Sequence, residues 1–283
     1  MLISIWRYWR AKRSLLKPAR QLKTNLLIST KMEFAELVHV ETENSRIQAY
    51  DGLAEFWHEY TSLQMPDYTS FIDRLMSIRG IRPEAILDLA CGTGTLTARL
   101  SGSAAEVVGL DQSETMLSHA RIRCKSISNV QFVRGEFPGF ELNRCFNAIV
   151  CPANSMNYVR TLSELNHVFR TVAKHLQPGG VFVFDTLTSR AMTVLSTFYL
   201  HITVDRGRFV MRFQFDPARR QQKALVILPA GVEEHIQIPI DPIDVIEAAN
   251  GTDLIVDDYF SSAIIPGRWC TGYTSFFVLT KRL

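Results

Sequence analysis

Residues 86–94 read Ile-Leu-Asp-Leu-Ala-Cys-Gly-Thr-Gly, and the stretch that follows, 95–100, is compatible with a helix. The apolar run around Asp88 is typical of a buried strand, and Gly92 and Gly94 indicate a tight turn between the strand and the helix. Such a turn brings backbone N–H groups and the positive end of the helix dipole close to a bound carboxylate or phosphate. The segment therefore predicts a cofactor site at the end of a strand in an α/β fold.

Two classes of cofactor use this geometry. A dinucleotide site favours the pattern G-x-G-x-x-G, whose third glycine allows close packing around a pyrophosphate. Thr97 occupies the position of that third glycine. The loop is therefore a poor match to a dinucleotide site, and a nicotinamide-dependent oxidoreductase is a distant alternative.

A second acidic residue follows the glycine turn. Residues 104–110 form a mainly apolar run that ends in Asp111, 17 residues after Gly94, close to the ~20 residues at which a ribose-binding acid follows such loops. A carboxylate at this position can accept hydrogen bonds from both ribose hydroxyls. Gln112 comes next, and Ser113 is the predicted N-cap of another helix.

Three further segments complete an ordered series. Residues 130–137 predict a strand ending in Gly135-Glu136-Phe137, residues 145–151 predict a strand, and Leu-x-Pro-Gly-Gly at 176–180 precedes the apolar run 181–185. Over residues 46–187 the chain resembles the class I S-adenosylmethionine-dependent methyltransferases. It is most similar to the small-molecule branch that includes sugar-amine and glycine-type N-methyltransferases.

The chain departs from the family pattern at three positions. Ala90 replaces the first glycine of the strictest form of the loop, Glu136 stands where the family usually has Asp, and Asn147 stands where it commonly has Asp. The resemblance implies S-adenosylmethionine as the cofactor, held at the methionine end with the help of Asp88. The implied cofactor-binding residues are Tyr50, Asp88, Ala90, Gly92, Gly94, Asp111, Gln112, Glu136 and Phe137.

Residues 46–60 resemble the family's helix that covers the cofactor. The resemblance implies that Tyr50 or Tyr60 donates a hydrogen bond to the methionine carboxylate, and Tyr60 is also a candidate catalytic residue. The alternative is an aromatic stripe packed against the sheet, because Tyr50, Leu53 and Trp57 share helical spacing. Asn154 is the second catalytic candidate, with Ser155 and Asn157 near it, in a segment where the family often contacts the methyl acceptor; a solvated loop is the alternative.

The pattern changes after the fifth predicted strand. Residues 209–215 and 232–240 alternate between apolar and polar, which predicts antiparallel strands within an insertion at 190–240. We expect this insertion to cap the substrate pocket, to form a dimer interface, or both. Alternation allows only one of Glu234 and His235 to face the pocket. A helix at 241–249 and strands at 253–260 and 275–281 complete the predicted fold: a Rossmann-like, seven-stranded, mostly parallel sheet with helices on both faces.

Charge is distributed unevenly along the chain. Residues 1–31 contain eight basic side chains and no acidic one, which leaves 23 basic and 28 acidic residues in the remainder. We predict a disordered basic leader over residues 1–40, followed by a methyltransferase domain over 41–283; membrane contact, organellar targeting and a translation start at Met32 are alternatives. The acidic remainder does not favour nucleic acid as a substrate.

Composition bears on metal binding, on the redox state of the cysteines and on membrane insertion. The five cysteines form no C-x-x-C pair and share no ligand spacing with the histidines, so we expect reduced thiols, a cytoplasmic location and no metal. No apolar run approaches the ~20 residues of a transmembrane helix. The predicted function is methyl transfer to oxygen or nitrogen of a small metabolite by a possible homodimer. The alternatives are an RNA or protein methyltransferase tethered by the leader, and a methyltransferase-like binding protein without catalysis.

The segment after the strand at 145–151 bears on the acceptor. Enzymes that methylate planar amines tend to carry an Asp- or Asn-Pro-Pro-Tyr box there, whereas this chain has Cys151-Pro152-Ala153-Asn154. The sequence lacks the aromatic ring of that box, and so methylation of nucleic-acid bases is disfavoured.

Overall fold

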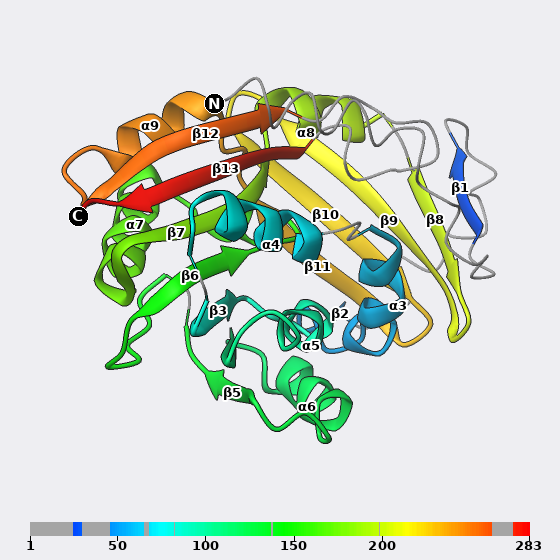
Figure 1. Ribbon diagram of the computed structural model, residues 1–283. Helices are drawn as coiled ribbons and strands as arrows, with labels where there is room; N and C mark the ends of the chain where they lie inside the picture. Colours follow the sequence, from blue (N-terminus) through cyan, green and yellow to red (C-terminus); the bar gives the residue numbers. More distant parts are fainter. Residues whose placement is uncertain are drawn as a thin grey trace, which may run out of the picture.

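The computed structural model describes residues 25–29, 46–64, 68–81, 83–136, 138–197, 199–261 and 274–283. Figure 1 shows two sheets, of which the larger has the strand order β12-β13-β7-β6-β3-β4-β5. Adjacent strands pair in parallel from β7 to β5, whereas β13 is antiparallel to both of its neighbours. The strands are β3 (Ala85–Leu89), β4 (Glu106–Asp111), β5 (Val130–Arg134), β6 (Phe146–Cys151), β7 (Leu176–Leu187), β12 (Leu254–Ser261) and β13 (Thr274–Lys281).

Helices cover both faces of this sheet. The larger core cluster packs α7 (Leu162–His175) and α9 (Pro242–Ala249) against one face, while α4 (Tyr68–Ile78) and α5 (Thr95–Leu100) pack against the other. Neighbouring residues of β3 divide between the two clusters, because successive side chains of a strand point to opposite faces. The predicted mostly parallel sheet with helices on both faces is confirmed.

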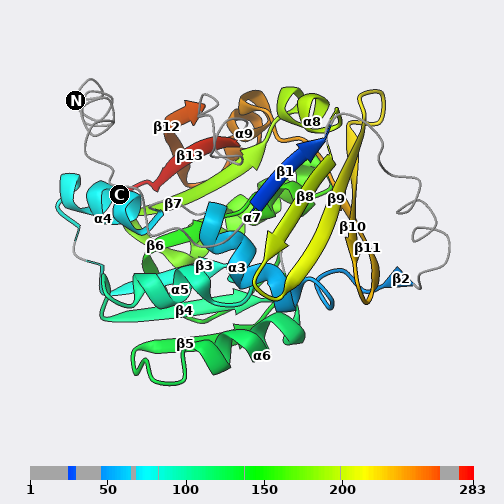
Figure 2. The ribbon, with the colours of Figure 1, turned by 90° about the vertical axis from the view of Figure 1, so that its right-hand side faces the viewer.

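The second sheet has the order β1-β8-β9-β10-β11-β2 and is antiparallel except between β11 and β2. Figure 2 shows this sheet beside the larger one, with α3 (Ala54–Gln64) between them. Side chains of α3 and of the preceding turn share a buried apolar cluster with the sheet, including Leu53, Phe56, Ile202, Phe209 and Val226. The strands are β1 (Asn25–Ser29), β2 (Arg46–Ile47), β8 (Tyr199–Val204), β9 (Gly207–Asp216), β10 (Gln221–Leu228) and β11 (Gly231–Gln237).

The structure corrects the prediction of one long helix over residues 46–60. Residues 46–47 form β2, a turn follows, and the helix begins only at Ala54. Tyr50 has a left-handed backbone, with φ 72°, and the side chain of Glu233 accepts hydrogen bonds from the N–H groups of Tyr50, Gly52 and Leu53. A buried carboxylate from a distant strand therefore holds this segment as a turn.

Two other differences concern the second sheet. Strand β8 was not predicted, and within the leader expected to be disordered over 1–40, residues 25–29 form β1 and pair with β8. The other residues of that leader lie outside the described part of the chain. In the described ranges, no helix has the length and apolar character needed to cross a bilayer.

Candidate active site

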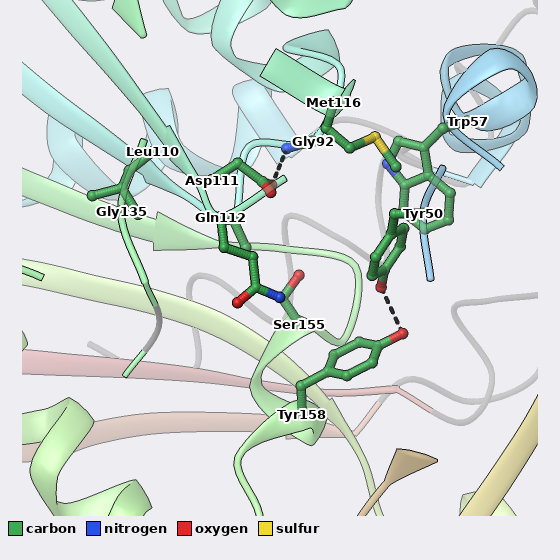
Figure 3. Close-up of a pocket in the computed structure, with 11 residues that line it drawn as sticks. Tyr50, Trp57, Gly92, Leu110, Asp111, Gln112, Met116, Gly135, Ser155 and Tyr158 are labelled. Carbon is green, nitrogen blue, oxygen red and sulfur yellow. Dashed lines mark hydrogen bonds between the residues drawn. The ribbon is translucent and has the colours of Figure 1, made fainter. Parts of the chain in front are cut away.

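A cleft opens at the carboxyl ends of β3 and β4, the usual place for ligands in open α/β sheets. It encloses about 580 Å³, including the space at its open mouth. Figure 3 shows Asp111 and Gln112 on one side of it, with Tyr50 and Trp57 opposite. Its lining residues are Tyr50, Trp57, Ala90, Gly92, Leu110, Asp111, Gln112, Met116, Gly135, Ser155 and Tyr158.

The glycine loop after β3 forms one edge of the cleft. Ala90, Gly92 and Gly94 all have left-handed backbones, with φ values of 59°, 55° and 74°. A Cβ atom on Gly92 would lie 2.9 Å from Nε1 of Trp57. Gly92 is therefore required both by its backbone conformation and by the close approach of the indole ring.

Asp111, at the end of β4, holds this loop in place. One carboxylate oxygen accepts from the Gly92 N–H at 2.8 Å, and the other accepts from the Ser113 N–H at 2.9 Å. Burial raises the pKa of Asp111, while its bonds to backbone N–H groups oppose that rise. The carboxylate thus lines the cleft and keeps lone pairs that can accept from a ligand's hydroxyl groups.

Asp88 lies beneath the loop rather than in the cleft. It is fully buried, and one carboxylate oxygen accepts from the Thr97 hydroxyl at 2.6 Å. The other oxygen has no hydrogen-bond partner among the described residues. Burial raises the pKa of Asp88 from 3.8 to about 7. Thr97, at the position of the missing third glycine, therefore anchors this acid, and a contact of Asp88 with the cofactor stays a prediction.

A chain of hydrogen bonds leads away from the cleft at Tyr50. The hydroxyls of Tyr50 and Tyr158 point toward one another in Figure 3 and are 2.6 Å apart, and the Tyr158 hydroxyl lies 2.9 Å from Nδ1 of His235. Nε2 of His235 lies 3.0 Å from a carboxylate oxygen of Glu233. Glu233 is fully buried and His235 nearly so. Burial raises the pKa of both tyrosines, so both hydroxyls keep their hydrogen near neutral pH.

The alternation of side chains along β11 decides which of its residues join the chain of hydrogen bonds. Glu233 and His235 share the inner face, whereas Glu234 forms an ion pair with Lys223 at 2.7 Å. This agrees with the prediction that only one of Glu234 and His235 faces inward. Tyr158 was not predicted, because nothing local in the sequence distinguishes it from other aromatic residues that follow strands.

Four other predicted residues lie outside the cleft, and a fifth lies outside the described residues. Tyr60 is buried against the rings of Trp57 and Phe209, with centroids 5.7 and 5.6 Å away, which is the aromatic packing considered as the alternative. Asn154 begins the short helix Ser155–Tyr158, and its backbone N–H donates to Asp185 at 2.7 Å. Gly94 and the exposed Glu136 do not line the cleft either, and Phe137 lies outside the described residues.

Ser155 and Asn157 follow the same strand and have different roles. Ser155 lines the cleft. Asn157 is fully buried, and its side-chain amide bonds to both backbone groups of Leu187 and to the carbonyl of Ile238. The predicted loop is thus a structural junction between β7 and β11, and Ser155 and Tyr158 are the residues it presents to the cleft.

The residues of the cleft fit S-adenosylmethionine. Asp111 and Gln112 supply polar groups for a ribose, and Leu110 and Met116 are apolar lining residues that suit an adenine ring. At this edge a ligand would meet the backbone of the glycine loop, because the close approach of Trp57 leaves no room for a side chain at position 92.

Comparison with known proteins agrees with this fit. Residues 86–180 match the model of a family described as a methyltransferase domain. The putative methyltransferase YqeM of Bacillus subtilis is 35% identical over 144 residues, which are 50% of this chain and 56% of that protein. The dTDP-3-amino-3,4,6-trideoxy-alpha-D-glucopyranose N,N-dimethyltransferase of Streptomyces venezuelae is 38% identical over 110 residues, 38% of this chain and 45% of that enzyme. The chain thus spans about half the length of these curated relatives.

Solved structures show the same fold. An S-adenosylmethionine-dependent methyltransferase from Clostridium acetobutylicum is similar with a TM-score of 0.71 at 21% identity, covering 83% of this chain and 99% of that one. An amino pentose methyltransferase from Micromonospora echinaspora, solved with S-adenosylmethionine bound, is similar with a TM-score of 0.62 at 22% identity, covering 84% and 99%. Residues 86–180 thus match a methyltransferase domain, and the chain has the fold of solved S-adenosylmethionine-dependent methyltransferases.

Proposed function

We propose that this protein is an enzyme that transfers a methyl group from S-adenosylmethionine to a nitrogen or oxygen atom of a small metabolite. The observation that carries the proposal is the cleft itself. In it, Asp111 at the end of β4 faces the aromatic side chains of Tyr50 and Trp57, beside the glycine loop. The relatives named for amino-sugar substrates support a small acceptor.

The proposed cofactor contacts follow from the lining of the cleft. Asp111 and Gln112 would hold the ribose hydroxyls, Leu110 and Met116 would contact the adenine, and the loop backbone at Gly92 would face the methionine end. When bound there, the cofactor supplies an activated methyl group on a sulfonium sulfur. The chain's own residues must align the acceptor, exclude water and remove a proton from the acceptor.

Tyr50 faces a conflict between two roles. A hydrogen bond from Tyr50 to the methionine carboxylate requires its hydroxyl hydrogen, which points to Tyr158 in this structure. The ring of Tyr50 packs edge-on against Trp57, with centroids 5.6 Å apart. We propose that the Tyr50 ring helps to close the cofactor site. A bond to the carboxylate would require the hydroxyl to leave Tyr158.

The second sheet is the proposed substrate cap. Its strand β11 contributes His235 and Glu233 to the hydrogen-bond chain at Tyr158, so the inserted strands of 190–240 are tied to the cleft. We propose that the methyltransferase domain spans residues 41–283 with this cap included. Tyr60 and Asn154 stay predicted catalytic residues, although neither lines the cleft.

The proposed partners are a small acceptor and a second copy of the chain, not nucleic acid. Among the lining residues that the structure describes, Asp111 is the charged one, and a carboxylate repels a polyanion. The described cysteines Cys91, Cys124, Cys145 and Cys151 are free thiols, which supports the proposed cytoplasmic location. Light scattering of the purified chain would show whether it dimerises.

Two experiments test the proposed function. Calorimetric titration should show that the full chain binds S-adenosylmethionine, and failure to bind it at millimolar concentration would reject the proposal. A screen with methyl-labelled cofactor should then show label on an amino-sugar nucleotide and not on bulk RNA or protein. A chain lacking residues 1–31 is the matched control, because an enzyme that acts on a small molecule should keep its turnover, whereas one that needs the leader as a tether should lose it.

A further inference from the structure

Four side chains from three distant parts of the sequence form one continuous hydrogen-bond chain that ends at the cleft. Tyr50 precedes α3, Tyr158 follows β6, and Glu233 and His235 lie on β11 of the second sheet. The three contacts measure 2.6 Å, 2.9 Å and 3.0 Å in that order from the cleft inwards. All three are within hydrogen-bond distance, so the side chains form one unbroken network.

The hydrogen positions in this chain follow from Glu233. Both of its carboxylate oxygens already accept from backbone N–H groups, at 2.9, 2.7 and 2.7 Å. The oxygen that faces His235 is one of these acceptors, so Nε2 of His235 carries a hydrogen and donates it to Glu233. In a neutral imidazole, Nδ1 is then a bare acceptor and must receive the hydrogen of Tyr158.

The same logic continues to the cleft. Because Tyr158 donates to His235, its oxygen is free to accept, and Tyr50 donates its hydrogen to it at 2.6 Å. The remaining lone pairs of the Tyr50 oxygen belong to a side chain that lines the cleft. The outer end of the chain is therefore a hydrogen-bond acceptor, and the group that fits it is a donor on the ligand.

We propose that Tyr50, Tyr158, His235 and Glu233 form a proton relay that deprotonates a protonated amine in the cleft, so that an amine is the methyl acceptor. This inference rests on the methyl-transfer function proposed above and names the class of substrate for it. Tyr50 is the residue that touches the substrate, whereas His235 and Glu233 act through the tyrosines.

Each proton in the relay has a defined destination. The ammonium proton moves to the Tyr50 oxygen as the Tyr50 hydrogen moves to Tyr158 and the Tyr158 hydrogen moves to Nδ1 of His235. His235 becomes an imidazolium paired with Glu233, and both tyrosines are again neutral. The amine's freed lone pair then forms the N–C bond while the methyl–sulfur bond breaks and leaves its electron pair on sulfur.

An amine suits a side-chain base better than an alcohol does. An alkylammonium group such as that of lysine has a pKa of about 10.4, whereas water, which is comparable to a hydroxyl acceptor, has a pKa of about 15.7. The negative charge of Glu233 also attracts a cation, and the relay neutralises that charge when it receives the proton.

The position of the hydrogen on the His235 ring can be tested in the free protein, without any acceptor. Long-range ¹H–¹⁵N NMR on the full chain with ¹⁵N-labelled histidines, assigned by the missing signal of His235→Gln, reports which ring nitrogen carries hydrogen. We expect hydrogen on Nε2, a bare Nδ1, and a shift of the Nδ1 signal in Tyr158→Phe. Hydrogen on Nδ1 alone, or no response to Tyr158→Phe, would overturn the relay whether or not an acceptor is ever found.

The second test measures turnover of an amine probe and of a hydroxyl probe. The probes are dTDP-3-amino-3,4,6-trideoxy-α-D-glucopyranose and its counterpart with a hydroxyl in place of the amine. We expect the amine to be methylated and the hydroxyl not, and we expect His235→Gln and Tyr158→Phe to lower kcat on the amine by about 100-fold or more while the Kd for S-adenosylmethionine changes less than threefold. His201→Gln and Tyr199→Phe, on β8 of the same sheet, are the matched controls and should keep kcat.

The outcomes separate the relay from the proposed function. Loss of cofactor binding by the unmodified chain would reject methyl transfer itself. Normal kcat in His235→Gln, or equal methylation of the hydroxyl probe, would reject the relay and leave methyl transfer standing. If neither probe is methylated, the NMR result decides the relay.

Discussion

The substitution Asp88→Asn should remove a loss of stability that this protein shows as the pH rises toward neutrality. Burial raises the pKa of Asp88 from 3.8 to about 7, so the folded chain keeps a proton on this carboxyl over a pH range in which the unfolded chain has released it. The unfolded state then binds fewer protons than the folded state. The free energy of unfolding therefore falls as the pH rises from about 4 to about 7.

The size of the effect follows from the width of that range. Between pH 5 and pH 7 the loss covers about two pKa units at ~1.36 kcal/mol each, or ~2.7 kcal/mol. Asparagine does not titrate, and its carbonyl oxygen can still accept from the Thr97 hydroxyl. Its amide group has no acceptor where the second oxygen of Asp88 lacks a partner, which costs about 1–3 kcal/mol at every pH. The variant should thus be less stable than the parent at pH 5 and about equal or more stable at pH 8.

Urea unfolding of both proteins at several pH values between 5 and 8 measures this difference. The stability of Asp88→Asn relative to the parent should rise by ~2.7 kcal/mol over that range. Asp205→Asn, in the exposed turn between β8 and β9, is the control for removing one negative charge. A relative stability that stays constant within about 0.5 kcal/mol from pH 5 to pH 8 would refute the reasoning.

Three further substitutions test the cofactor loop. Asp111→Ala should weaken binding of S-adenosylmethionine by about 1.5–3 kcal/mol in a calorimetric titration, and an unchanged Kd would reject the ribose contact. Ala90→Gly should raise the free energy of unfolding by about 0.5–1 kcal/mol in urea, because glycine adopts a φ of 59° without strain. Gly94→Ala should lower it by about 1–3 kcal/mol, since the new Cβ would lie 3.0 Å from side-chain atoms of both Ala120 and Phe132. Equal stabilities of the Ala90 and Gly94 variants would contradict the assigned backbone conformations.

Much of the cofactor half was predictable because its signals are local. The strand around Asp88, the glycine turn and the strand ending in Asp111 each lie within a few consecutive residues, and all form where the sequence predicts them. Parallel pairing of β3 with β4 then brings Asp111 next to Gly92. The failure over residues 46–53 has a long-range cause: the sequence gives no sign that Glu233, 183 residues away, would bind the backbone at Tyr50 and so replace the start of a helix with a turn.

The sequence by itself determined the fold class and the glycine loop and pointed to the proposed cofactor, because these depend on periodicity and on contiguous motifs. Only the tertiary structure decided which residues meet at the other side of the cleft. Tyr50, Tyr158 and His235 are separated by 108 and 77 residues along the chain, and their hydroxyl and imidazole groups come into contact only when the second sheet packs beside the first. A hydrogen bond has a reach of about 3 Å, so no spacing in the sequence can specify it across such separations, and the proposed amine acceptor rests on that packing.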